Sequence, residues 1–215
     1  MRLKRNIYNP YFFIPFILWA VAGGLLLSIF TAKQLFFAVN TTYSDSADTL
    51  FYYATYMGDG AVIIPILFVL LLIPRFRNWW YFLTALLCNL IPFFVQQILK
   101  AEFNSPRPFK YFHNAPWIHY LYQWPYLSDR SFPSGHSAGA FSFFCFLSLL
   151  LPGKYSAWGF VFFLLAISVC YSRIYLTAHF FADVYAGSII GAVTTSVIFV
   201  VMNKYRDAFT KRDAR

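Results

Sequence analysis

Six runs of apolar residues, separated by polar connections, dominate the pattern along this chain. They lie at residues 11–33, 57–73, 79–99, 137–151, 156–172 and 180–202. An α-helix of roughly 20 apolar residues crosses a bilayer, and most of these runs approach that length. The second run is short and contains Pro65, so it is the weakest of the six. The pattern predicts an all-α protein, a membrane-embedded six-helix bundle that forms a single domain over residues 1–215.

The composition agrees with a membrane protein. Hydrophobic residues make up 60% of the chain and charged residues 12%, whereas about a quarter of the residues of a soluble protein are charged. The net charge of +9 does not indicate nucleic acid, because the basic residues lie at the edges of apolar runs and form no single patch. The first run continues for roughly 20 residues after a basic start, so we expect a retained helix and not a cleaved signal peptide. Three isolated cysteines within apolar runs indicate buried small side chains; they are Cys88, Cys145 and Cys170.

The basic residues at the ends of the runs predict the orientation in the membrane, because cytoplasmic loops are enriched in Lys and Arg. With the N-terminus inside, the cytoplasmic side holds most of them: Arg2, Lys4, Arg5, Arg75, Arg77, Lys154, Lys204, Arg206, Lys211, Arg212 and Arg215. The opposite side holds Lys33, Lys100, Arg107, Lys110, Arg130 and Arg173. We therefore predict a multi-pass protein of the cell (inner) membrane with both termini in the cytoplasm.

Three polar clusters stand at the ends of the apolar runs. They are Lys100-x6-Arg107-Pro108, Pro133-Ser134-Gly135-His136 and Ser172-Arg173-x5-His179-x3-Asp183. Charged groups close to a bilayer core are costly, so their presence indicates a function. An even number of crossings separates the clusters from one another. All three are therefore expected on one face, the outer or periplasmic one, where they form an outward-facing active site.

These residue types suit a phosphate group. Phosphoryl transfer spreads negative charge over oxygens, and Lys100, Arg107 and Arg173 supply positive charge to match it. Ser134 is a good N-cap for the fourth helix, whose N-terminal N–H groups favour an anion. Gly135 lets the backbone approach a ligand closely. We predict all five as phosphate-binding residues.

The two histidines of the clusters suit covalent catalysis. If the sixth helix begins near Ala178, His179 and Asp183 are i and i+4 on one helical face. The carboxylate then fixes the tautomer of the imidazole, as in hydrolytic triads. We therefore predict His179 as the nucleophile that forms a phosphohistidine, Asp183 as its orienting group and His136 as the general acid.

In this order the three motifs resemble the three signatures of the type 2 phosphatidic acid phosphatase (PAP2) superfamily, which also includes vanadium haloperoxidases. The motifs extend over residues 100–183, and every defining position of the signatures matches. The resemblance implies a membrane lipid phosphatase that needs no metal and no other cofactor. A zinc or iron site at His136, His179 and Asp183 is an alternative, which three nearby cations oppose.

We therefore expect hydrolysis of a phosphate or diphosphate monoester of a lipid at the outer leaflet. Undecaprenyl diphosphate, phosphatidylglycerol phosphate, phosphatidate and the phosphates of lipid A are the candidates. A lipid phosphotransferase and a non-catalytic anion carrier are the alternatives, although a carrier predicts charges in the middle of spans, where this chain has none. Two features stay open. The aromatic segment 109–126 fits either an interfacial belt or a lid, and Gly58-Asp59-Gly60 fits either a helix start or a support of the site.

Overall fold

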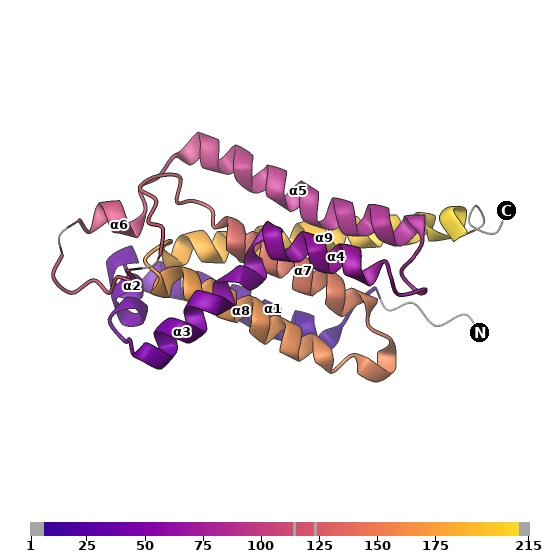
Figure 1. The fold of residues 1–215 in the computed structure, drawn as a ribbon, viewed down its shortest axis with the longest axis horizontal. Helices are drawn as coiled ribbons and strands as arrows, with labels where there is room; N and C mark the ends of the chain where they lie inside the picture. Colours follow the sequence, from indigo (N-terminus) through magenta and orange to yellow (C-terminus); the bar gives the residue numbers. More distant parts are fainter. Residues whose placement is uncertain (1–6, 114, 123, 211–215) are drawn as a thin grey trace.

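The computed structural model describes residues 7–113, 115–122 and 124–210. Six terminal cations used for the orientation lie outside them: Arg2, Lys4, Arg5, Lys211, Arg212 and Arg215. All regular elements in the described part are helical (Figure 1). In chain order they are α1 (Pro10–Ile29), α2 (Ala32–Asn40), α3 (Asp45–Ala54), the 3₁₀ turn η1 (Thr55–Gly58), α4 (Gly60–Leu70), α5 (Trp79–Phe103), α6 (Pro108–Tyr111), α7 (Gly135–Leu150), the 3₁₀ turn η2 (Gly153–Tyr155), α8 (Trp158–Tyr175) and α9 (Phe181–Thr210).

The membrane character of the chain is confirmed, whereas the count of six spans is not. Among the described residues four helices are long and apolar enough to cross a bilayer, namely α1, α5, α8 and α9. The segments Asp45–Gly58 and Gly60–Leu70 reach that length only together, and they are bent by 59° at the break between them. Helix α7 has 16 residues, about 24 Å, which is shorter than a hydrocarbon core of about 30 Å.

The segment 34–56, a polar connection between the first two predicted spans, is mostly helical. Thr31 and Gln34 form a capping box at the start of α2, and Ser44 caps α3 through the N–H of Ala47. Phe36 of α2 is fully buried and packs on Phe112. The hydropathy pattern does not reveal α2 and α3, because a short helix that packs on the bundle needs only one apolar stripe and not a continuous apolar run.

The second predicted run, 57–73, is also different from the expectation. Its regular part is α4, which is 11 residues long and begins after Asp59. The Asp59 carboxylate accepts a hydrogen bond from the N–H of Ala61 and so caps the helix at that point. The chain therefore turns where an uninterrupted span was predicted.

Helix α7 lies in the middle of the molecule and packs against α5, α8 and α9. Two glycines of α9 allow a close approach, since a Cβ at Gly187 would lie 2.5 Å from the carbonyl oxygen of Ser134. A Cβ at Gly191 would lie 2.3 Å from that of Ala138. Small residues of this kind let membrane helices pack backbone to backbone. The N-terminal half of α7 is thereby fixed against α9.

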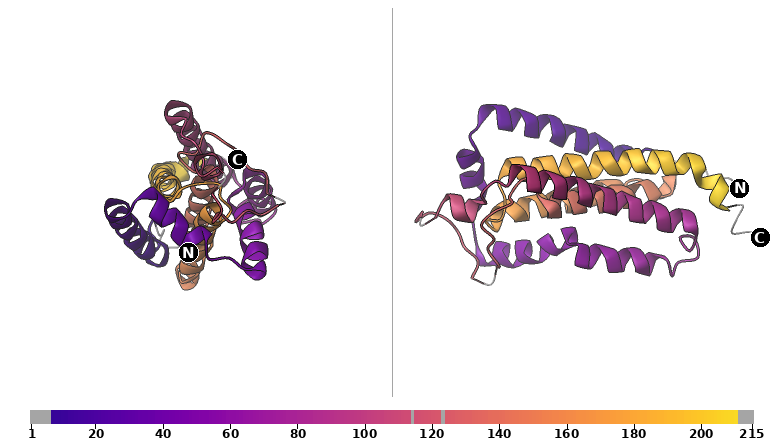
Figure 2. Two further views of the ribbon diagram at one scale, coloured as in Figure 1. Left: turned by 90° about the vertical axis from the view of Figure 1, so that its left-hand side faces the viewer. Right: turned by 90° about the horizontal axis from the view of Figure 1, so that it is seen from above.

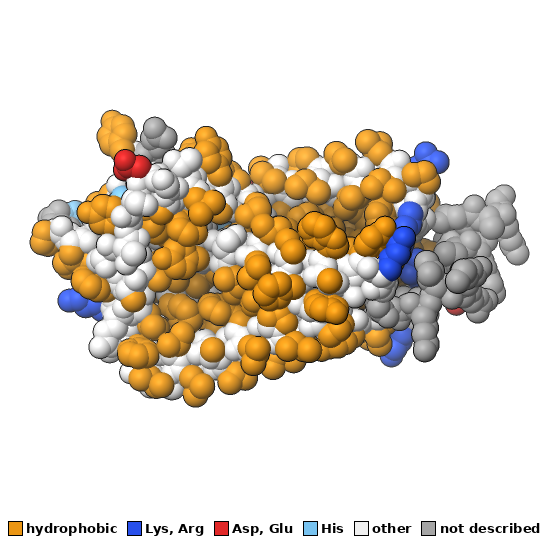
Figure 3. Space-filling model, turned by 90° about the horizontal axis from the view of Figure 1, so that it is seen from below, with side chains coloured by type: hydrophobic (Ala, Val, Ile, Leu, Met, Phe, Trp, Pro, Cys, Tyr) orange, Lys and Arg blue, Asp and Glu red, His pale blue; other side chains and the backbone are white. Residues whose placement is uncertain are grey.

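The helices run along the long axis of the molecule, so both ends carry turns (Figures 1 and 2). The start of α1 and the end of α9 lie at one end. The motif-bearing end of α5, the start of α7 and the α8–α9 turn lie at the other. The face in Figure 3 is mostly hydrophobic between these ends, as expected of a surface that contacts lipid.

Candidate active site

The three predicted clusters meet at one end of the bundle. The guanidinium of Arg107 donates through Nη1 to the carbonyl of Ala178 over 3.1 Å, and the same atom lies 3.3 Å from Nε2 of His179. The backbone N–H of Ser134 donates to the carbonyl of Asp183 over 2.9 Å. Segments far apart in the sequence are thus joined directly, as the parity of the crossings predicted.

His179 occupies a turn and not a helix, which corrects the expected helix start near Ala178. The N–H groups of Ala178 and His179 both donate to the carbonyl of Arg173, and α9 begins at Phe181. The Asp183 carboxylate accepts from the N–H of Phe180 over 2.9 Å and so closes the first turn of α9. The contact predicted from i,i+4 spacing still forms, because His179 Nδ1 lies 3.5 Å from Asp183 Oδ2.

Ser131 completes this pair, and the sequence reasoning missed it. Its hydroxyl donates to Asp183 Oδ2 over 2.5 Å and lies 3.5 Å from His179 Nδ1. The side chain is fully buried. Its position two residues before Pro133 was the available signal, but a serine beside a motif is too common to single out. The carboxylate oxygen that faces the imidazole is therefore held by two donors, Ser131 and the Phe180 N–H.

Burial and neighbouring charges keep His179 neutral. The side chain is nearly inaccessible. Burial lowers its pKa well below the usual value for histidine, and the positive charges of Arg107, Arg173 and Lys100 lower it further. With Asp183 at Nδ1 and a guanidinium at Nε2, the partners favour the tautomer that carries its proton on Nδ1. Nε2 then has a free lone pair directed at the cationic cluster.

The three cations are held by different elements. Arg107 also donates through Nε to the carbonyl of Asp129 over 2.9 Å, so two carbonyls fix its guanidinium. Arg173, in the last turn of α8, is buried and donates to the hydroxyl of Thr55 over 2.8 Å. Lys100 lies in the last turn of α5 and interacts electrostatically with both arginines. Together they place three positive charges around His179.

The start of α7 forms the next wall. Ser134 is the N-cap, as predicted, and its hydroxyl accepts from the N–H of Ser137 over 3.3 Å. The N–H of Ser134 donates to the carbonyl of Asp183. The groups left for a ligand are the hydroxyl of Ser134 and the backbone amides of the first turn of α7. Gly135 lies against Gln96 of α5, where a Cβ would come within 3.3 Å of the amide oxygen. His136 follows on the first turn of α7.

The aromatic segment, left open between a belt and a lid, has a contact in the site. The ring of Trp124, from the aromatic segment 109–126, lies 5.0 Å from the guanidinium of Arg173, a cation–π distance. His119 of the same segment contacts Asp48 of α3 over 2.8 Å. Trp124 therefore lies against one cation of the cluster, which favours the lid. Ser172 donates to the carbonyl of Val169 over 2.7 Å, a bond within its own helix.

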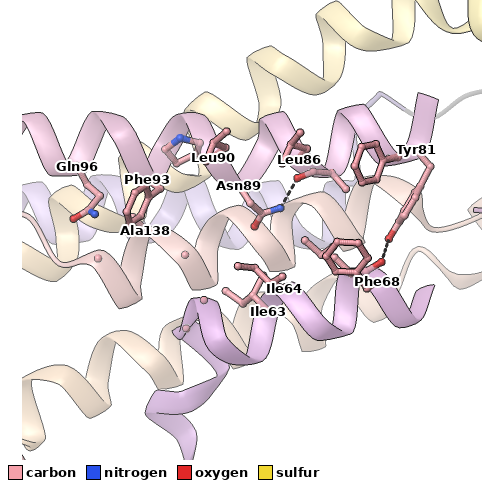
Figure 4. A pocket seen from close by; sticks show the side chains of 18 of the residues that line it. Ile63, Ile64, Phe68, Tyr81, Leu86, Asn89, Leu90, Phe93, Gln96 and Ala138 are labelled. Carbon is pink, nitrogen blue, oxygen red and sulfur yellow. Dashed lines mark hydrogen bonds between the residues drawn. The ribbon is translucent and has the colours of Figure 1, made fainter. Parts of the chain in front are cut away.

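An apolar cavity of about 340 Å³ lies between α4 and α5 and extends to the start of α7 (Figure 4). Ile63, Ile64 and Phe68 face it from α4, and Leu86 and Phe93 from α5. At one end it reaches Gln96, Gly135 and Gly139. The cavity thus joins the membrane-facing side of the bundle to the residues beside His136.

Metal-ligand clusters are absent from this arrangement as far as the described residues go. No three His, Cys, Asp or Glu side chains among them lie close enough together to hold a metal ion. The charge beside His179 comes from Lys and Arg side chains.

These observations define an all-helical membrane protein with a histidine–carboxylate pair in a cationic cluster. The sequence model of the PAP2 superfamily matches residues 77–207. The chain belongs to this superfamily.

Known relatives include membrane phosphatases. The undecaprenyl-diphosphatase of Sulfolobus acidocaldarius is 28% identical over 163 residues, which cover 74% of this chain and 72% of that protein. The crystal structure of Aquifex aeolicus LpxE matches with a TM-score of 0.65 and 28% identity, over 83% of this chain and 99% of that one. The PAP2-type phosphatidylglycerolphosphate phosphatase of Bacillus subtilis has a TM-score of 0.59 over 94% of this chain and 97% of its own, and at 21% identity it supports the fold alone.

Proposed function

We propose that this protein hydrolyses a phosphate or diphosphate monoester of a lipid through a phosphohistidine at His179. The observation that carries the proposal is a buried imidazole with a carboxylate at Nδ1 and a guanidinium 3.3 Å from Nε2. A nucleophile needs a free lone pair beside groups that stabilise the negative charge of the transferring phosphoryl group. Both requirements meet at one atom, Nε2.

In the first step Nε2 of His179 attacks the terminal phosphorus, and the bond from that phosphorus to the leaving oxygen breaks. The leaving oxygen is the lipid oxygen of a monophosphate or the bridging oxygen of a diphosphate, which departs with the lipid monophosphate. Asp183 stabilises the positive charge that develops on the imidazole, and Ser131 holds the carboxylate in place. Arg107, Arg173 and Lys100 bind the equatorial oxygens together with the amides at the start of α7. His136 gives a proton to the departing oxygen.

In the second step water attacks the phosphohistidine. His136, now neutral, takes a proton from the water, and the bond between phosphorus and Nε2 breaks. Inorganic phosphate leaves and both histidines return to their starting states. We propose that no metal takes part, because the positive charge that a metal would supply is already present on Lys100, Arg107 and Arg173.

The apolar cavity between α4 and α5 supports a lipid as the substrate (Figure 4). A lipid that lies with its tail in this cavity has its headgroup near Gly135 and His136. The cavity walls are aliphatic and aromatic, so they stabilise a hydrocarbon chain by burying its surface. Substrate then enters sideways from the bilayer.

We propose six crossings, made by α1, the bent pair of α3 and α4, α5, α7, α8 and α9. Helix α7 is short, but it is surrounded by three spans and needs little contact with lipid. With both termini in the cytoplasm, where most of the end-of-span cations lie, the site faces the outer leaflet. The substrate is therefore proposed to be a lipid phosphate exposed on the outer face of the cell membrane.

Among the candidate lipids we favour a polyprenyl diphosphate such as undecaprenyl diphosphate. Two observations support this choice: the similarity to an undecaprenyl-diphosphatase, and a third cation, Lys100, beside the two arginines of the site. Lys100 lies at the end of α5, on a flexible stem that extends to a second phosphate. Phosphatidylglycerol phosphate, phosphatidate and lipid A remain the comparison substrates.

The test is release of phosphate by the purified protein from undecaprenyl diphosphate, phosphatidylglycerol phosphate, phosphatidate and lipid A. Wild type should act on at least one of them, and fastest on the diphosphate. The Lys100→Ala variant should lose far more activity on the diphosphate than on phosphatidate. His179→Ala serves as the blank and should lose at least a thousandfold, as enzymes do without their nucleophile.

The outcomes separate the activity from the substrate. No release from any of the four lipids would overturn the proposed function. Equal losses for Lys100→Ala across the panel, or a preference of wild type for a monophosphate, would exclude the diphosphate and leave the phosphatase activity standing.

A further inference from the structure

A second carboxylate lies beside the second histidine of the site. Asp59, between η1 and α4, places its Oδ2 atom 3.7 Å from Nε2 of His136. The two side chains are 37% and 28% exposed, so both reach the edge of the site and neither is free in solvent. The arrangement parallels the contact between Asp183 and His179, although Asp59 comes from a helix that carries none of the three sequence motifs.

The backbone fixes Asp59 relative to His136. Its Oδ1 atom accepts from the N–H of Ala61 over 2.9 Å, and its carbonyl accepts from the next turn of α4. The preceding Gly58 packs directly on α7, because a Cβ there would lie 2.4 Å from the carbonyl oxygen of His136. A Cβ at Gly139 would lie 2.8 Å from the carbonyl oxygen of Gly58. With one carboxylate oxygen committed to the helix cap, the other is turned toward the imidazole.

The charges around His136 make a nearby anion useful. Lys100 from α5, Arg107 from the α5–α6 connection and Arg173 from α8 all disfavour a positive charge on this imidazole. Asp183, in the first turn of α9, and His179, just before that helix, contact each other. A general acid must nevertheless be protonated before the lipid oxygen departs. Asp59 is the carboxylate that faces His136 from the η1–α4 side.

We propose that Asp59 is a positioning residue that keeps His136 protonated and correctly oriented for proton transfer to the leaving group. This inference rests on the proposed function, and it names the residue that controls proton transfer from His136 in that reaction. The distance of 3.7 Å exceeds a hydrogen bond, so the proton on Nε2 is not held by the carboxylate and is free to pass to the lipid oxygen. Asp59 acts through its negative charge and transfers no proton itself. His136 loses its proton to the leaving oxygen and regains one from the attacking water.

The test uses Asp59→Asn, which removes the charge and keeps the cap, because Asn caps helices as well as Asp does. The quantity is kcat/KM, which covers the steps up to departure of the leaving group. With phosphatidate, a lipid monophosphate whose alkoxide leaving group needs a proton, Asp59→Asn should lose at least tenfold. With p-nitrophenyl phosphate, whose nitrophenolate leaves without one, the loss should be less than threefold. The matched control Asp45→Asn, at an exposed position in the first turn of α3, should leave both values unchanged.

A second measurement does not depend on the soluble substrate. The basic limb of the kcat/KM profile with phosphatidate reports the acid of the free enzyme, and it should move to lower pH in Asp59→Asn. A purely structural role of Asp59 would lower activity on both substrates alike and leave the limb in place, which would overturn the inference. Wild-type rates in Asp59→Asn would overturn it as well. If wild type itself releases no phosphate from any lipid, the proposed function fails first and the inference falls with it.

Discussion

Replacing Ser131 by Ala tests whether the His179–Asp183 pair works as an assembled unit. The serine hydroxyl donates to Asp183 Oδ2 over 2.5 Å in a fully buried environment. Without it the carboxylate keeps one donor, the N–H of Phe180. The side chain of Asp183 is then free to turn away from Nδ1 of His179, which lies at 3.5 Å in the intact arrangement.

The structure gives the size of the effect. A hydrogen bond to a charged group contributes about 1.5–3 kcal/mol. If that orientation is needed in the transition state, kcat/KM should fall roughly 10- to 150-fold. The loss should be smaller than that of His179→Ala, because the nucleophile and the cations remain.

The assay is phosphate release from the best lipid substrate in detergent micelles, with folding checked by thermal unfolding. Ser142→Ala is the matched control, since Ser142 is also buried and its hydroxyl donates to the carbonyl of Gly191 on α9. That control should retain activity within about twofold, as expected of a site outside the catalytic cluster. A folded Ser131→Ala protein as active as Ser142→Ala would refute the reasoning.

Three further predictions follow from the site and its proposed setting. The folded state lowers the pKa of His179, so below the ordinary pKa of about 6.5 the unfolded chain binds more protons than the folded protein. The free energy of unfolding should therefore fall on acidification, by at most about 1.4 kcal/mol per pH unit. The variant His179→Asn should show a smaller decrease per pH unit. Activity should persist in excess EDTA and be inhibited by vanadate, whereas full loss in EDTA with recovery on adding zinc or magnesium would contradict a metal-free mechanism. A cysteine in place of the fully exposed Tyr122, in a variant without the three native cysteines, should react with an impermeant maleimide on intact cells, and labelling only after lysis would place the site in the cytoplasm.

The convergence of the three clusters could be predicted because charged residues are rare in this chain. Arg107 and His179 are separated by two predicted spans, so the parity of the crossings put them at one end, and a 3.3 Å contact joins them. The N-cap role of Ser134 also followed from its residue type and its place before an apolar run.

What could not be predicted depends on tertiary packing. Ser131 meets Asp183 over a separation of 52 residues, and nothing in its local sequence separates it from other serines. Asp59 looked like a helix start, and its second contact depends on how closely Gly58 approaches α7. The cavity is lined by residues of α4, α5 and α7, and hydropathy along the chain carries no information on how these helices pack.

The central claim is that phosphate passes through His179, and trapping the intermediate tests it most directly. Wild-type protein mixed with a ³²P-labelled lipid phosphate and quenched in alkali within milliseconds should carry label, because phosphohistidine survives base and is lost in acid. Peptide mapping should find the phosphate on the segment that contains His179, and His179→Ala should carry none. Label on another residue, or equal labelling of the variant, would contradict the account, as would turnover by wild type without any trapped phosphoprotein.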